Sequence, residues 1–193
     1  ESQMHALSRI RQSQQHLLGL ISSVLDFAKV EAGSVRYEFE DLPVNEAVRT
    51  AEVLTAPQVR SRNLSLIWVP SDPPLWIRAD REKLRQILLN LVANAIKFTP
   101  ARGTVTISCT ASAEIVRITI TDTGEGIAPD QLDRVFEPFV QADASFTRTH
   151  EGVGLGLAIS RDLAIGMGGN VTVVSTLGEG SRFTLELPRA KAG

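Results

Sequence analysis

The most informative part of the sequence is Asn90-Leu91-Val92-Ala93-Asn94-Ala95-Ile96-Lys97-Phe98-Thr99-Pro100. Apolar residues before and within this stretch recur at three- and four-residue steps, which predicts an amphipathic helix that ends here. The apolar positions are Leu84, Ile87, Leu88, Leu91, Val92 and Ala95. A polar set follows the same steps on another face of the helix. It consists of Gln86, Asn90, Asn94 and Lys97.

This polar stripe combines amides with one ammonium group. An amide oxygen suits a hard cation such as Mg²⁺, and an ammonium suits a phosphate. The stripe is therefore compatible with a site for magnesium and phosphate. A solvated face of a surface helix has the same pattern, and the helix alone does not decide between the two interpretations.

Glycine-rich and aromatic segments follow in order along the chain. Asp122-Thr123-Gly124-Glu125-Gly126-Ile127 follows a strand-like run, and Phe136-Glu137-Pro138-Phe139 comes next. Gly152-Val153-Gly154-Leu155-Gly156-Leu157-Ala158-Ile159 then opens a predicted helix. Gly178-Glu179-Gly180 separates the last two strand-like runs.

Together with residues 90–100, the first three of these segments resemble the N box, the first glycine box, the F box and the second glycine box of a known family. Gly178-Glu179-Gly180 resembles a further glycine turn near the end of that family's domain. That family is the ATP-binding catalytic domain of sensor histidine kinases, whose superfamily includes DNA gyrase, a heat-shock chaperone and mismatch-repair ATPases. The resemblance covers residues 35–188. It implies an α/β fold: a two-layer α/β sandwich of the Bergerat type, with a mixed sheet that carries three helices on one face, preceded by a long N-terminal helix.

The composition narrows the class of protein. The chain has 193 residues, of which 43% are hydrophobic and 22% charged, so it suits one domain plus an extra element. The net charge of −2 argues against nucleic acid as a partner. No apolar run reaches the roughly 18 residues of a membrane helix. We expect a cytoplasmic protein or the cytoplasmic portion of a membrane-anchored sensor, and a piece of a longer chain, since Glu1 replaces an initiator methionine.

Residues 1–33 differ from the rest of the chain. A heptad seam of Leu7, Ile10, Gln14, Leu17, Ile21, Val24 and Ala28 runs through them. We expect this helix to pack in a bundle with partner helices; packing against the chain's own globular domain is the alternative. The segment resembles the second helix of the family's dimerisation hairpin, which implies a homodimer in the intact protein. The predicted domains are an incomplete hairpin (1–33), a catalytic ATP-binding domain (34–189) and a tail (190–193).

Strands and helices alternate after the first helix. Strands are expected at 35–40, 64–69, 75–79, 104–110, 115–121, 171–175 and 182–187. Four helices are expected after the first one. One spans 44–60, with a bend or an end near Pro57, and the next begins after Asp80, which would cap it. A short helix follows Pro129, and the last spans 155–167. Residues from Pro188 onward are expected to fray, and the single cysteine, Cys109, is expected to be a small core residue.

Asp122 ends a strand whose alternating residues are apolar, so its carboxylate is expected at the mouth of a buried pocket. A carboxylate there can accept a hydrogen bond from an exocyclic amine, and the resemblance implies that this amine belongs to adenine. Gly124 and Gly126 would let the backbone approach the base closely. An ordinary Asp-Gly turn is the alternative.

Gly152, Gly154 and Gly156 precede a helix, and Leu155 lies between the last two. Helix N-terminal amides and the helix dipole favour phosphate, so these four residues are predicted to bind it. A flexible linker is the alternative for the glycines.

Residues 140–151 would form a lid over the nucleotide. Phe136 and Phe139 would pack against the domain and so anchor the start of this lid. Arg148 is the only cation of this lid. It is predicted to contact phosphate, with a solvated surface arginine as the alternative.

The resemblance implies a protein-histidine kinase that binds ATP and Mg²⁺. Asn94 would be the main magnesium ligand, Asn90 would support it, and Lys97 would contact phosphate. Hydrolysing members of the superfamily carry a glutamate base where this chain has Asn90, and an amide cannot take a proton usefully. The resemblance therefore implies transfer of the γ-phosphoryl group to a histidine, for relay to a response-regulator receiver domain.

The acceptor histidine of the family lies on the first helix of the hairpin, before Glu or Asp and near Pro. His5, His16 and His150 lack that context, because His150, although it precedes Glu151, falls in the lid. The acceptor is therefore expected on a helix that this chain lacks. Two alternatives stay open: a non-catalytic nucleotide-binding scaffold, and a serine kinase of the same superfamily.

Overall fold

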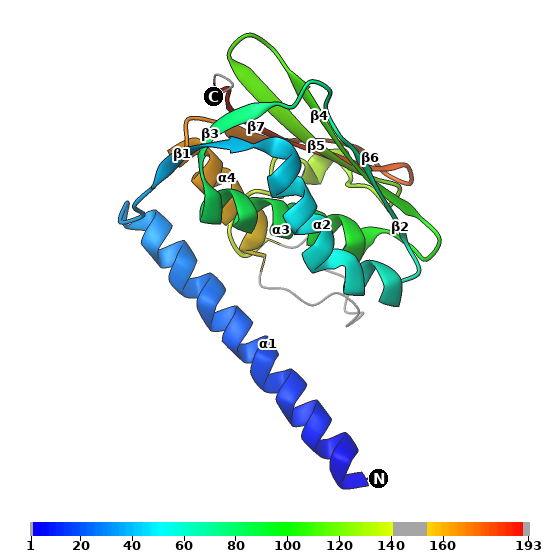
Figure 1. Cartoon of the computed structure of the whole chain (residues 1–193). Coiled ribbons are helices and arrows are strands. Elements are labelled where there is room, and N and C mark those ends of the chain that lie inside the picture. Colours follow the sequence, from blue (N-terminus) through cyan, green and yellow to red (C-terminus); the bar gives the residue numbers. More distant parts are fainter. Residues whose placement is uncertain (1, 141–153, 191–193) are drawn as a thin grey trace.

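The computed structural model describes the backbone of residues 2–140 and 154–190, and within the first helix it describes side chains at positions 10, 11, 14 and 17–31. A five-stranded mixed sheet with the order β2-β4-β5-β7-β6 forms one layer (Figure 1). Its strands are β2 (Ser65–Val69), β4 (Thr104–Ala111), β5 (Ile115–Asp122), β7 (Gly180–Pro188) and β6 (Asn170–Thr176). Only β2 and β4 pair in parallel; the other neighbours are antiparallel.

A second, two-stranded sheet pairs β1 (Phe39–Pro43) with β3 (Trp76–Asp80). Three helices cover one face of the large sheet, as predicted (Figure 1). They are α2 (Val44–Ser61), α3 (Arg81–Phe98) and α4 (Gly156–Gly166). A short 3₁₀ turn, η1 (Pro129–Gln131), follows the predicted Pro129 start.

The apolar face of α3 forms the centre of the core. Its six predicted apolar positions are each at most 1% exposed, and they lie in the same cluster as Ile118 and Ile120 of β5. Asp80 caps this helix as predicted, since its Oδ1 accepts a hydrogen bond from the backbone N–H of Lys83 at 3.0 Å. Cys109 packs against the same core, and burial raises the pKa of its thiol to about 12. The polar stripe of α3 is therefore held in place by a fully packed opposite face.

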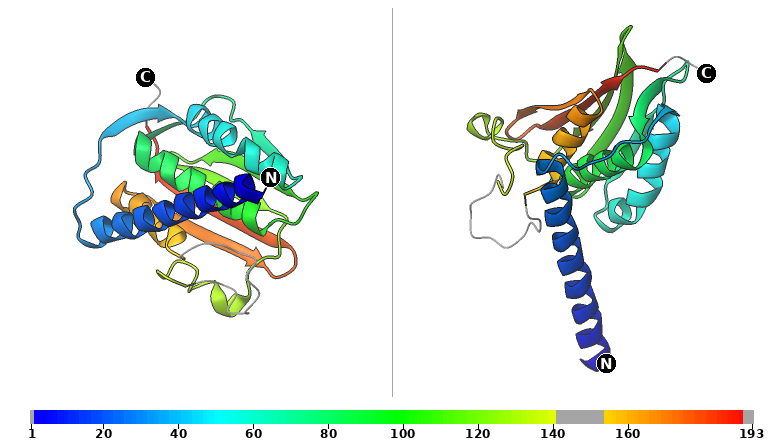
Figure 2. Two further views of the ribbon diagram at one scale, coloured as in Figure 1. Left: turned by 90° about the horizontal axis from the view of Figure 1, so that it is seen from below. Right: turned by 90° about the vertical axis from the view of Figure 1, so that its left-hand side faces the viewer.

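Helix α1 (Ser2–Glu31) projects from the helical side of the molecule (Figures 1 and 2). It ends before Gly33, whose φ of 59° is left-handed, as expected for a helix stop. Six apolar residues of α1 are between 45% and 63% exposed: Ile10, Leu17, Leu18, Ile21, Val24 and Leu25. Over these positions the seam does not pack against the globular domain. Within the described ranges, no helix is both long and apolar enough to cross a membrane.

The helix predicted at 44–60 is confirmed as α2, which runs through Pro57 to Ser61. Two other expectations were wrong. The strand predicted at 35–40 begins only at Phe39, because Tyr37 packs against Gly166 of α4 and residues 34–38 have no neighbouring strand in the described chain. Fraying does not begin at Pro188: Pro188 belongs to β7, and Ala190 is buried, with its N–H bonded to the carbonyl oxygen of Trp76 at 2.9 Å.

Candidate functional site

Asn90 lies midway along α3, and its amide faces the first turns of α4. Its Nδ2 donates a hydrogen bond to Oγ of Ser160 at 2.8 Å, and Ser160 is only 2% exposed. A Cβ atom placed on Gly156 would overlap Oδ1 of Asn90. The second glycine box therefore packs directly on the polar stripe, which brings together two motifs that are about 65 residues apart in the sequence.

The other members of the stripe lie on either side of Asn90. Nε2 of Gln86 donates a hydrogen bond to Oδ2 of Asp26 on α1 at 3.1 Å. Asn94 is half-buried and forms no hydrogen bond with its side chain in the part of the chain that the structure describes. Nζ of Lys97 lies 4.8 Å from the centre of the Phe98 ring.

Asp122 is the last residue of β5 and is 4% exposed. Its Oδ1 accepts hydrogen bonds from the backbone N–H of Gly124 at 2.8 Å and of Ser181 at 3.3 Å. Burial raises the pKa of this carboxyl, and the nearby charge of Glu125 raises it further, against the two N–H donors. Among the described residues, only Oδ1 accepts hydrogen bonds, so Oδ2 remains available to a ligand.

The loop after Asp122 requires its glycines. A Cβ on Gly124 would lie 2.6 Å from Oδ1 of Asp122 and 2.6 Å from the carbonyl oxygen of Phe98. Gly126 has a φ of 71°, and a Cβ there would overlap the carbonyl oxygen of Thr176. The first glycine box is thus packed between the end of α3 and the end of β6, which brings Asp122 to the same helix that carries Asn90.

Gly154 and Leu155 of the second glycine box directly precede α4, and Leu155 is its N-cap residue. Gly154 has a φ of 75°, and its carbonyl oxygen accepts a hydrogen bond from the N–H of Phe139 at 3.0 Å. Leu155 is 1% exposed, so its side chain anchors the start of the helix. Its predicted contact with phosphate can therefore only involve its backbone. Gly152 and Arg148, with most of the predicted lid and His150, lie outside the described residues.

The two phenylalanines of the F box are placed differently. Phe136 packs against the core beneath the guanidinium of Arg161, which lies 4.8 Å from its ring centre. Phe139 is 59% exposed and meets Phe27 of α1 edge to face, with ring centres 5.8 Å apart. The sequence analysis did not identify the contacts of Phe27 or Ser160. The only sign of Ser160 in the sequence was one hydroxyl directly after the apolar run Leu157-Ala158-Ile159.

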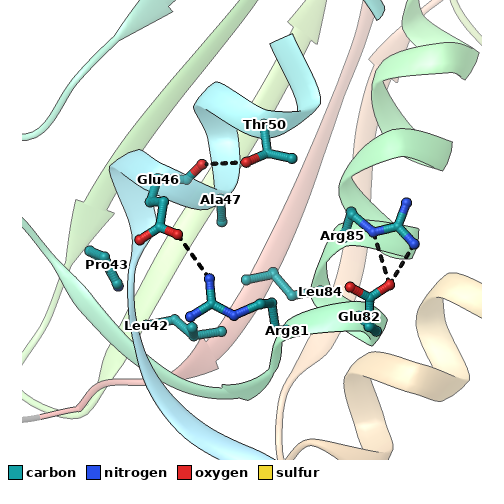
Figure 3. Close-up of a pocket in the computed structure, with 9 residues that line it drawn as sticks. All are labelled: Leu42, Pro43, Glu46, Ala47, Thr50, Arg81, Glu82, Leu84 and Arg85. Atoms are coloured by element: carbon teal, nitrogen blue, oxygen red, sulfur yellow. Dashed lines mark hydrogen bonds and ion pairs between the residues drawn. The ribbon is translucent and has the colours of Figure 1, made fainter. Parts of the chain in front are cut away.

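A small pocket of about 160 Å³ lies at the opposite end of α3, between α2 and the small sheet (Figure 3). Arg81, Glu46, Glu82 and Arg85 line its rim, and Arg81 is paired with Glu46 at 2.9 Å. This volume is below the range of pockets that hold a nucleotide-sized ligand, roughly 300–1,000 Å³. We therefore do not assign the nucleotide to this pocket.

Magnesium is the metal that the sequence predicts here. Among the described residues, no three His, Cys, Asp or Glu side chains come together as a metal-binding group. Mg²⁺ keeps several waters and binds through few protein ligands together with substrate phosphates, so a group of three such side chains is not required. The amide oxygen of Asn90, which faces the start of α4, and the amide of Asn94 fit this kind of donor set.

The model of a protein family described as histidine kinase-, DNA gyrase B- and HSP90-like ATPases matches residues 79–191. The chain belongs to this family. The match includes α3, the Asp122 loop and α4, and therefore the whole site described above.

Within the ATPase family, the chain is similar to sensor kinases of bacteria. A protein named as a sensor-like histidine kinase of Rhizobium meliloti (strain 1021) is 37% identical over 193 residues, which cover 100% of this chain and 37% of that protein. The sensory/regulatory protein RpfC of Xanthomonas campestris pv. campestris is 38% identical over 195 residues, 97% of this chain and 27% of RpfC. The chain thus spans well under half the length of these relatives.

Two solved structures of the family share this fold. Full-length ShkA in complex with AMPPNP superposes with a TM-score of 0.88 at 38% identity, over 100% of this chain and 40% of ShkA. A nucleotide-free catalytic domain of the histidine kinase ThkA superposes with a TM-score of 0.70 at 28% identity, over 80% of this chain and 99% of that domain. The predicted two-layer α/β fold is confirmed.

Proposed function

We propose that this chain is the catalytic ATP-binding part of a sensor histidine kinase. In this proposal it binds ATP with Mg²⁺ and transfers the γ-phosphoryl group to a histidine on a hairpin helix outside the chain. A response-regulator receiver domain then accepts the group on an aspartate. The observation that carries the proposal is the convergence on α3 of an adenine-type carboxylate, Asp122, and a metal-type amide, Asn90, which itself contacts the start of α4.

Asp122 would read the base. Its Oδ1 is occupied by backbone donors, and Oδ2 would accept the exocyclic amine of adenine. Gly124 and Gly126 keep side chains away from this position, which leaves room for a planar ring.

The middle and the C-terminal part of α3 would hold the phosphates. Backbone N–H groups around Gly154, Leu155 and Gly156 open α4, and such a helix start attracts anions. Lys97 would contact phosphate, and Asn94 and Asn90 would offer amide oxygens to the metal. Bound magnesium would neutralise charge that builds on the phosphate oxygens during transfer.

Position 90 holds an amide and not a carboxylate that could act as a general base, and transfer to histidine needs no such base. The bond between the γ-phosphorus and the β–γ bridging oxygen breaks, a P–N bond forms to imidazole, and ADP leaves. Neutral imidazole already carries a nucleophilic lone pair, so no carboxylate is needed to remove a proton before attack. Hydrolysis, in contrast, would need a group that activates water.

The partners are also part of the proposal. The exposed seam of α1 supports dimerisation through this helix in the intact protein, because an apolar heptad stripe is stable only when it is covered. A cytoplasmic site of action follows from the supply of ATP and of receiver domains.

The first experiment tests adenine recognition with Asp122→Asn. The asparagine keeps Oδ1 for the two N–H donors and directs an amide towards the adenine amine. ATP affinity in magnesium should fall about tenfold, which corresponds to about 1.4 kcal/mol. Calorimetry measures this, and Asp72→Asn, in an exposed loop, is the matched control with unchanged affinity. Equal affinity of the native chain for GTP and ATP would rule out this role of Asp122.

The second experiment tests transfer. Radiolabelled ATP is supplied with a separate polypeptide that carries the cognate hairpin and its histidine. Acid-labile label should appear on the hairpin and not on this chain, at a reduced rate because the tether is missing. Tight ATP binding without label on the hairpin would favour the non-catalytic scaffold, and acid-stable label would favour the serine kinase.

A further inference from the structure

The contact between Asn90 and Ser160 gives α4 a second role at the site. Ser160 lies one helical turn after Gly156, faces α3 and is 2% exposed. Its Oγ accepts the hydrogen bond from Nδ2 of Asn90 at 2.8 Å. No other side-chain hydrogen bond links α3 to α4 within the described residues, so the amide of Asn90 depends on this serine for its position.

The hydrogen bond decides which atom of the amide is left for a ligand. An asparagine amide has an NH₂ donor and an oxygen acceptor that are nearly equal in size, so only its partners fix their orientation. With Nδ2 bound to Ser160, Oδ1 is the amide atom closest to the start of α4: a Cβ on Gly156 would meet Oδ1 first and Nδ2 at 2.9 Å. A cation can bind the oxygen but not the NH₂ group.

We infer that Ser160 is a positioning residue for the magnesium site, which holds the amide of Asn90 so that its oxygen faces the second glycine box. The inference rests on the proposed function, because it assumes that Asn90 meets a metal bound with the nucleotide. Ser160 itself touches neither metal nor nucleotide. Its removal leaves a partly buried NH₂ group without this partner, so the amide turns or moves, and the oxygen is no longer held in place.

The test is the gain in ATP affinity that magnesium produces. Calorimetry measures ATP binding to the whole chain in excess magnesium and in EDTA, and the ratio of the two affinities isolates the metal. Ser160→Ala should reduce this ratio about fivefold to tenfold, in line with one lost hydrogen bond. Affinity in EDTA should stay within about twofold. Thr55→Ala removes another buried hydroxyl, on α2, and should leave both affinities unchanged.

Combining Ser160→Ala with a substitution of Asn90 distinguishes a positioning role of Ser160 from a role in packing. Asn90→Asp replaces the amide by a carboxylate, in which either oxygen can bind the metal whichever way the group is turned. In this background Ser160→Ala should change the magnesium ratio by less than about twofold, so the two substitutions are not additive. Circular dichroism confirms that each variant is folded at the temperature of the titration.

Each result has one meaning. An unchanged magnesium ratio in Ser160→Ala would overturn the inference while leaving the proposed function intact. Equal losses with and without magnesium, or a full loss in the Asn90→Asp background, would assign Ser160 to packing and would also overturn it. ATP binding by the native chain that does not respond to magnesium would overturn the metal site of the proposed function, and the role of Ser160 with it.

Discussion

Helices α3 and α1 carry the same kind of amphipathic pattern, but only α3 finds a cover for its apolar face within the described chain. The six apolar positions of α3 are at most 1% exposed, whereas six apolar residues of α1 are 45% to 63% exposed. The period of a pattern therefore shows that a helix has an apolar face. What covers that face depends on the rest of the fold or on another molecule.

The contacts of α1 with α3 and with the core that the structure describes lie near the C-terminal end of α1. Phe27 and Val30 pack against the core, Asp26 accepts a hydrogen bond from Gln86, and Phe27 contacts Phe139. Helix α1 is thus attached to the globular body over its last two turns, and of the side chains described before them, Ile10, Leu17 and Leu18 are exposed. Substitutions in the apolar face of α3 should therefore lower the free energy of unfolding more than substitutions in the exposed part of α1.

The largest effect is expected in the middle of α3. Leu91 is 0% exposed, so Leu91→Ala removes buried methyl groups and leaves a cavity beneath the sheet. The free energy of unfolding should fall by about 2–5 kcal/mol. Urea denaturation followed by circular dichroism measures this loss at low protein concentration, which disfavours association through α1.

The matched control is Leu18→Ala on α1. Leu18 is 63% exposed, so the same chemical change should alter the free energy of unfolding by no more than about 0.5 kcal/mol. A loss comparable with that of Leu91→Ala would show that the α1 seam is covered in solution even at low concentration, and the difference between the two helices would disappear.

Asp80 connects the two regions and gives the next largest effect. Its Oδ1 caps α3 at the N–H of Lys83, and its Oδ2 accepts the N–H of Glu38, in the segment that follows α1, at 2.8 Å. Asp80→Ala should destabilise the chain by about 1–2 kcal/mol. Asp72→Ala, in an exposed loop, should change stability by no more than about 0.5 kcal/mol.

The contribution of Asp80 should depend on pH. Burial alone would raise the pKa of this carboxyl, but the backbone N–H groups of Glu38 and Lys83 hold it below the usual value of 3.8. The stabilisation is therefore present above pH 3.8 and is lost as the pH falls through the lowered pKa. A difference between the native chain and Asp80→Ala that stayed constant down to the most acidic pH would contradict this assignment.

The elements that could be predicted from sequence are those whose pattern has a local cause. Helix α3 combines a 3.6-residue period with an Asp80 cap, and the antiparallel pair of β4 and β5 combines alternation with a short connection. The strand expected at 35–40 was wrong for residues 35–38, because alternation shows only that every second residue faces other parts of the chain. Tyr37 is partly buried and packs against Gly166 of α4, and the described chain has no neighbouring strand to pair with its backbone.

The site divides in the same way. Asp122 could be identified because it directly follows an alternating strand and precedes glycines. The hydrogen bond from Asn90 to Ser160 joins residues 70 positions apart, and it exists only because α3 and α4 pack side by side on the sheet. No spacing within either segment encodes such a contact, so its discovery needed the structure.

The smallest effect is expected where α1 meets the body. Phe27 and Phe139 lie edge to face at 74°, but Phe139 is 59% exposed, so the pair should contribute only about 0.5 kcal/mol, the lower end for aromatic pairs. Phe27→Leu should therefore increase hydrogen exchange of the last α1 turns about twofold to threefold, and Phe139→Leu should do the same. The double variant should exchange no faster than either single one, because the contact can be lost only once. Leu25→Ala, exposed on the same helix, serves as the control with unchanged exchange. Additive effects of the two phenylalanine substitutions would show that the rings act independently, and attachment of α1 would then rest on Asp26 and Val30.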